Sequence, residues 1–207
     1  MDPKDALRHY LDEQRTSLVG KLDGLDEYAV RRPLTPTGTN LLGLVKHVAW
    51  IQLGYFTTVF GRPPGRVAPY DREGGNPDDD MWAQADESRD EILELHRYSA
   101  QQADATLAEL PLDVPGVVPW WRPGHQEVTL HRIAVHVIVD TSRHAGQADI
   151  LRETLDGRVG MKPDDPNIPG RTPQEWAEYC GRIEAAARTV SRPAARLTGE
   201  PRGLSGS

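Results

Sequence analysis

Residues 136–149 read HVIVDTSRHAGQAD, and they lie in a stretch whose apolar residues recur at helical spacing. Thr129 can cap this helix at its N-terminus, and Gly157 can end it, because glycine readily adopts the left-handed conformation common just after a helix. We therefore expect one long amphipathic helix over residues 129–156. Its apolar stripe favours a fold in which other helices cover that face.

The same stretch carries three polar residues on one helical face. His136, Asp140 and His144 follow one another at intervals of four residues, and positions four apart drift by only about 40° around a helix. Polar groups on a core-facing stripe are costly to bury unless they have partners. The pattern raises the question of whether these side chains hold a metal ion.

Apolar periodicity predicts three more long helices and a shorter terminal one. The first should follow the cap Asp2-Pro3, and the second should begin at Thr39 or Asn40. The terminal helix should start at Thr172-Pro-Gln-Glu175, which is a capping box. The expected bounds of the first three are about residues 3–24, 40–60 and 81–110.

Asp78-Asp79-Asp80 is expected to cap the third helix, with Trp82 and Ala85 among its core positions. Loops rich in Pro and Gly should precede and follow this helix, at residues 61–75 and 111–124. The second loop holds Trp120-Trp121, which would either wall a pocket or cover the end of the bundle. Only residues 114–118 show a pattern compatible with a strand.

Together these elements predict an all-α fold, a four-helix bundle with long loops and an extra C-terminal helix. We expect a single domain over residues 1–190. Residues 191–207 contain Gly, Pro, Ser and Arg but little to bury, so we expect a disordered tail.

Composition narrows the classes of function. The 207 residues carry a net charge of −7, which disfavours a nucleic-acid partner, and no apolar run is long enough to cross a membrane. The N-terminus lacks the pattern of a signal peptide, so a cytoplasmic location is expected. Cys180 is the single cysteine, which excludes an intramolecular disulfide and a multi-cysteine metal site; we place it in the core.

Asp140 and His144 form a pair at i and i+4 that can converge on one ion, and His47 can join them from an opposing core stripe. Two imidazoles and a carboxylate leave at least one coordination position open, as in catalytic metal sites. Zn²⁺ suits this ligand set best, and Ni²⁺ and Fe²⁺ also accept it.

Spacing alone leaves other interpretations open. A histidine on an apolar face is more often a core residue with a hydrogen bond, and Asp140 and His144 could simply bond to each other. His136 could replace Asp140 or His144 as a ligand, because His136 and Asp140 are four residues apart, as Asp140 and His144 are.

Two segments resemble a known family. NLLGLVKHVAW at residues 40–50, followed by Tyr55-Phe56, and VIVDTSRHAGQADILRE at residues 137–153 are similar to the DinB family of metal-binding four-helix proteins. More narrowly, the segments are similar to the DUF664 branch of that family, which is related to mycothiol-dependent maleylpyruvate isomerase and to mycothiol and bacillithiol S-transferases. It covers about residues 3–156.

The resemblance implies a metal held by His47, Asp140 and His144, with His136 outside the motif. Relatives more often carry His or Glu where this chain has the shorter Asp140. The family also implies a small thiol as cosubstrate. Mycothiol is favoured because only four of the 24 basic residues are Lys, a bias typical of high-GC genomes.

Three functions remain in competition. The first is a metal-dependent transferase or isomerase that uses a low-molecular-weight thiol on a small electrophile. The second is a hydrolase that uses a metal-activated water. The third is a stress-associated protein without enzymatic activity that binds a metal or a small ligand. A homodimer is compatible with each.

Overall fold

The computed structural model describes residues 1–191, with the side chain of Ser191 left aside. The chain divides into two compact units, Met1–Asp165 and Pro166–Ser207, and each is considered by itself. Apart from Ser191, the expected disordered tail lies outside the described residues. The single domain over residues 1–190 stays a prediction.

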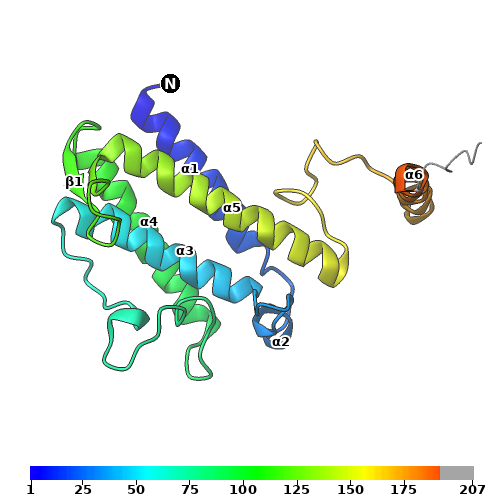
Figure 1. Cartoon of the computed structure of the whole chain (residues 1–207), viewed down its shortest axis with the longest axis horizontal. Helices are drawn as coiled ribbons and strands as arrows, with labels where there is room; N and C mark the ends of the chain where they lie inside the picture. Colours follow the sequence, from blue (N-terminus) through cyan, green and yellow to red (C-terminus); the bar gives the residue numbers. More distant parts are fainter. Residues whose placement is uncertain (192–207) are drawn as a thin grey trace, which may run out of the picture. The chain divides into compact units, whose positions relative to one another are not determined.

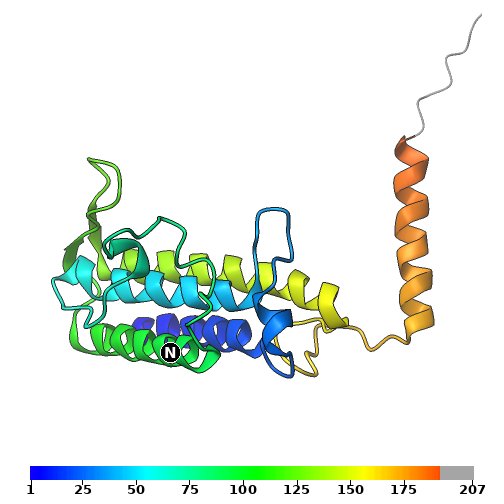
Figure 2. The same ribbon diagram turned by 90° about the horizontal axis from the view of Figure 1, so that it is seen from below.

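The first unit is built on four long helices, as Figures 1 and 2 show: α1 (Pro3–Gly20), α3 (Leu41–Phe56), α4 (Arg89–Glu109) and α5 (Leu130–Asp156). Helices α1 and α3 each pack against both α4 and α5. This arrangement confirms the predicted all-α bundle. Within the described residues, no helix is both long enough and apolar enough to cross a membrane.

Helix directions explain the long connection between α3 and α4. Gln52 bonds to Ser99, and one turn further along, the Phe56 carbonyl accepts from Thr106, so α3 and α4 run parallel. Parallel neighbours need a chain that returns along the bundle. Residues 57–88 make that return, and they contain the 3₁₀ turns η1 (Thr58–Phe60) and η2 (Pro69–Asp71).

Two apolar clusters fill the bundle. One contains Leu11, Tyr55, Phe56 and Val137, and the other contains Leu18, Leu44, Val48 and Ala148, with other side chains in each. From the first cluster to the second, residue numbers increase along α1 and α5 and decrease along α3. Helix α3 is therefore antiparallel to α5, which places the early turns of α3 opposite the later turns of α5.

Several predicted helix ends are confirmed by their caps. The Asp2 and Asn40 side chains accept hydrogen bonds from Lys4 N and Gly43 N, and Thr129 accepts one from Arg132 N. Gly157 ends α5 at a φ of 76°, a conformation that glycine adopts without strain. Local hydrogen-bonding chemistry was sufficient to find these ends.

The predicted start of the third helix was wrong. Helix α4 begins at Arg89 behind a capping box of Ser88 and Glu91, because this pair satisfies two backbone N–H groups reciprocally. Residues 76–88 instead form turns, and Trp82 and Ala85 are exposed rather than core. The prediction also missed the short helix α2 (Glu27–Arg31).

The connection between α4 and α5 contains a small antiparallel sheet of β1 (Pro115–Val117) and β2 (Glu127–Thr129), in which Gly116 pairs with Val128. The strand pattern at residues 114–118 was therefore meaningful. This hairpin brings Trp120 and Trp121 next to the start of α5.

The second unit contains helix α6 (Pro173–Ser191). Its predicted capping box is present, since Glu175 N donates to the Thr172 hydroxyl and Thr172 N donates to the Glu175 carboxylate. Cys180 is exposed on α6, so its expected core position was wrong; a single helix offers no interior.

Candidate metal centre and adjoining cavity

The bundle brings His47 from α3 together with Asp140 and His144 from α5. One ligand atom from each lies within 4.8 Å of the other two. The two imidazole rings meet edge to face with their centroids 4.8 Å apart, and His144 Nε2 lies 3.6 Å from Asp140 Oδ2. These side chains are half-buried, so an ion among them would be sheltered yet reachable.

His47 is oriented by a residue that sequence reasoning did not assign to the site. The Nδ1 atom of His47 lies 2.8 Å from Oδ2 of Asp80, whose side chain is 6% exposed. A buried carboxylate at Nδ1 favours the tautomer with its proton on that nitrogen, which leaves Nε2 free as a ligand.

His144 has an analogous partner within its own helix. Its Nδ1 lies 2.9 Å from the Oε1 atom of Gln147, which can only accept, so Nε2 of His144 is free to bind an ion. Burial lowers the pKa of His144, and the charge of His47 acts in the same direction. Both effects favour the neutral imidazole that metal binding requires.

Asp140 supplies the clearest sign that the site suits a cation. Its Oδ2 atom is buried and has no hydrogen-bond partner among the described residues. His144 Nε2, at 3.6 Å, is at ion-pair distance from this oxygen but forms no hydrogen bond to it. A buried carboxylate oxygen that accepts no hydrogen bond is costly, and a divalent ion would satisfy it. The set of two imidazoles and one carboxylate is one that divalent metals accept.

The segment that carries Asp80 is anchored on α3. The fully buried ammonium of Lys46 donates to the carbonyls of Asp79 and Trp82 at 2.7 and 2.9 Å and to Glu87 at 2.7 Å. Gly43 lets this segment approach, because a Cβ there would lie 1.9 Å from the Met81 carbonyl oxygen. The same face of α3 thus holds the segment and presents His47 to it.

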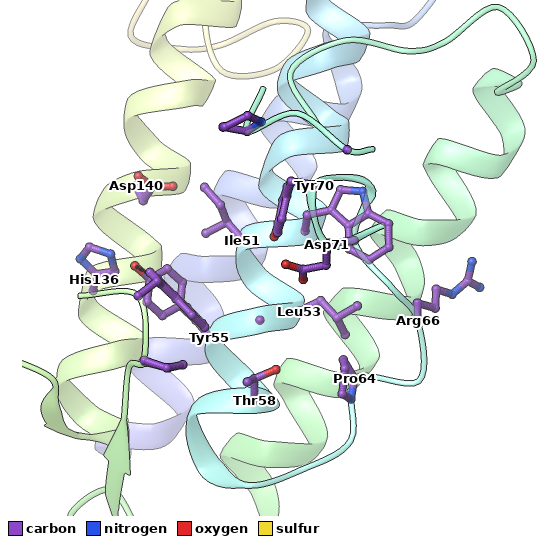
Figure 3. Close-up of a pocket in the computed structure, with 17 residues that line it drawn as sticks. Ile51, Leu53, Tyr55, Thr58, Pro64, Arg66, Tyr70, Asp71, His136 and Asp140 are labelled. Carbon is purple, nitrogen blue, oxygen red and sulfur yellow. Dashed lines mark hydrogen bonds between the residues drawn. The ribbon is translucent and has the colours of Figure 1, made fainter. Parts of the chain in front are cut away.

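A cavity of about 780 Å³ begins at Asp140 and extends between α3, α5 and the loop after α3 (Figure 3). Most of its wall is apolar or aromatic. Its polar side chains include Thr58, Arg66, Asp71 and His136. Such a cavity can receive a small organic molecule beside the candidate metal site.

The hairpin closes one end of the cavity. Trp120 lines it, as the first of the two roles considered for the tryptophans requires. Trp121 instead packs against the bundle end, edge to face with His136 at 5.1 Å. His136 lines the cavity and contacts Tyr55, with ring centroids 4.9 Å apart, and it is not part of the three-residue cluster.

The fold and this site define a four-helix protein with a candidate divalent-metal centre beside an organic-ligand cavity. Residues 6–157 match a family described as Mycothiol-S-transferase, so the chain belongs to that family. The match confirms the resemblance to the DinB-like, mycothiol-related family, while the narrower DUF664 assignment stays a prediction. No curated protein matched the chain.

Proposed function

We propose that this protein transfers a low-molecular-weight thiol to a small electrophile at a metal site formed by His47, Asp140 and His144. The family description favours mycothiol as this thiol. The observation that carries the proposal is the buried Oδ2 of Asp140, which accepts no hydrogen bond among the described residues and lies beside two imidazoles at the wall of the cavity. Family membership adds the thiol.

His47 and His144 would bind the ion through Nε2, and Asp140 would bind it through its carboxylate. Zn²⁺ fits this set best, with Ni²⁺ and Fe²⁺ as alternatives. The chemistry that such an ion supplies is deprotonation of a coordinated thiol, which makes the thiol a nucleophile at neutral pH.

The chain's own residues perform the remaining tasks. Asp80 and Gln147 hold the two imidazoles in their ligand tautomers. The aromatic wall of the cavity binds the electrophile and displaces water from it. Cys180, the single cysteine of the sequence, lies on α6 and outside the matched residues 6–157. In this proposal the nucleophilic sulfur comes from the cosubstrate.

The test compares turnover of an alkyl iodide by zinc-loaded protein with and without mycothiol, with bacillithiol as a second thiol. We expect product only when protein, metal and thiol are all present. The variant His144→Ala should lose this activity, and His125→Ala, which removes an exposed histidine, should keep it.

Turnover that is independent of thiol would contradict the proposal and favour hydrolysis by a metal-activated water. Tight zinc binding without turnover of any electrophile, with either thiol, would favour a binding protein.

A further inference from the structure

Tyr55 occupies an unusual position in the cavity wall. Its side chain comes from α3 and is 8% exposed, yet it lines the cavity. Its hydroxyl oxygen accepts hydrogen bonds from the indole N–H groups of Trp121 at 2.8 Å and Trp120 at 3.3 Å. Both indoles come from the hairpin, so the hairpin holds the phenol in place.

Hydrogen-bond accounting shows what the hydroxyl has left to offer. A phenol hydroxyl has one O–H donor, and its oxygen can also accept. Both indoles act as donors to this oxygen, and an indole N–H cannot accept in return. Among the described residues, Tyr55 donates to no acceptor. The O–H is therefore an unused donor in a nearly buried position, and accepting two N–H bonds strengthens it.

The position of this donor relative to the candidate metal centre follows from α5. The ring of Tyr55 contacts the ring of His136, and Asp140 lies one helical turn beyond His136, about 6 Å along the axis. Figure 3 shows Tyr55 and His136 facing each other, with Asp140 further along α5 on the same side of the cavity. A small molecule in the cavity can therefore contact both Tyr55 and Asp140.

We propose that the Tyr55 hydroxyl is a catalytic hydrogen-bond donor to an oxygen of the electrophile, and that the favoured electrophiles are α,β-unsaturated carbonyl compounds. This inference rests on the proposed function. The separation between Tyr55 and the candidate metal centre favours this class. The carbonyl oxygen of such a compound lies three bonds from the carbon under attack, whereas an epoxide oxygen is bonded directly to that carbon.

The reaction balances without a further reactant. The thiolate sulfur forms a bond to the β carbon while the electron pair of the C=C bond shifts onto the carbonyl oxygen. That oxygen takes the Tyr55 proton, and the two indole N–H groups stabilise the phenolate that remains. The proton that the thiol released to water on deprotonation returns to Tyr55 through water, and the enol tautomerises to the saturated carbonyl product.

The first experiment measures kcat/KM for mycothiol addition to methyl vinyl ketone and for alkylation by an alkyl iodide, which has no oxygen acceptor. Tyr55→Phe should lower the value for the ketone about 100-fold and leave the value for the iodide within about twofold. Tyr10→Phe removes the same atom from an exposed tyrosine of α1 that does not line the cavity and should leave both values nearly unchanged. Equal losses on both substrates in Tyr55→Phe, or no loss, would overturn the proposal.

The second experiment needs neither metal nor thiol. Acetophenone, an unreactive aromatic ketone, is bound to metal-free protein and its carbonyl stretch is recorded by infrared spectroscopy. A hydrogen bond from Tyr55 should lower this frequency, and Tyr55→Phe should return it toward the value in an apolar solvent. Equal frequencies in both proteins would overturn the donor role. If neither electrophile is converted by wild type, the proposed function fails, and the infrared result still decides the role of Tyr55.

Discussion

The imidazole of His47 and the carboxylate of Asp80 form a 2.8 Å hydrogen bond across 33 positions of sequence. The bond joins a helix that carries a candidate metal ligand to a segment without regular secondary structure. Asp80 is buried, and its position depends on Lys46 and Gly43, which lie one turn or less before His47. The geometry of the candidate metal centre thus depends on how this segment packs on α3.

Removal of the Asp80 carboxylate should weaken metal binding. Partners of this kind orient metal-ligating histidines, and their loss typically lowers metal affinity about 10- to 100-fold. We expect Asp80→Ala to show a decrease of this size in a chelator-competition titration with Zn²⁺. Asp78→Asn, an exposed change of charge in the same segment, is the control. Equal affinities in Asp80→Ala and wild type would show that the hydrogen bond has no part in binding.

A methyl group at Gly43 should destabilise the fold. The added Cβ would lie 1.9 Å from Met81 O, so backbone has to move, and overpacking of this kind costs about 1–3 kcal/mol. Gly146 is a matched helical glycine with open space around it, where alanine should stabilise by about 0.5–1 kcal/mol. Urea unfolding of metal-free Gly43→Ala and Gly146→Ala measures both. The same sign of change in the two variants would argue against close packing at Gly43.

Lys46 should contribute to stability through the three hydrogen bonds of its buried ammonium. Lys46→Met keeps the length of the side chain but removes the donor that Lys46 supplies to Glu87 and to two carbonyls. Breaking a buried ion pair in this way costs about 3–5 kcal/mol, and partial exposure of Glu87 places the expectation at the low end. Lys162→Met, at an exposed position, serves as the control. A loss in free energy of unfolding no larger than that of the control would contradict this account.

His96 should make the protein sensitive to acid. Burial lowers the pKa of His96 to about 4, and Arg15 and Arg97 act in the same direction. The unfolded chain therefore binds a proton between pH 6.5 and 4 that the folded protein excludes, so stability falls as pH falls through this window. The loss should reach about 3 kcal/mol near pH 4.

Urea unfolding of wild type and His96→Gln between pH 4 and 8 isolates this effect, because other titrating groups are common to both proteins. The variant should lose less stability than wild type below pH 6.5. Parallel curves for the two proteins would show that His96 takes its proton as readily in the fold as outside it.

Local chemistry made much of the fold predictable. The ends of α5 could be found because Thr129 and Gly157 act on backbone groups within a few residues, and the bundle followed from apolar periodicity. The start of α4 was misplaced because Asp78-Asp79-Asp80 has the chemistry of a cap without serving as one. Its last carboxylate bonds to His47 instead, a contact between distant segments that no local pattern reveals.

The candidate metal ligands were predictable from the sequence, but the surroundings of Tyr55 were not. His47, Asp140 and His144 could be grouped from helical spacing and family motifs, and the structure brings them together. Tyr55 was visible only as part of a motif. Its role depends on two tryptophans from a hairpin that follows α4, and only packing brings their N–H groups to its oxygen.

The metal content of the purified protein tests the central claim most directly. Wild type, His47→Ala, Asp140→Ala and His144→Ala are compared with His136→Ala after zinc loading and removal of excess ion, with circular dichroism to establish folding. We predict about one zinc per chain in wild type and His136→Ala and a substoichiometric content in the other three. Full zinc content in the folded His47→Ala and His144→Ala variants would contradict the account.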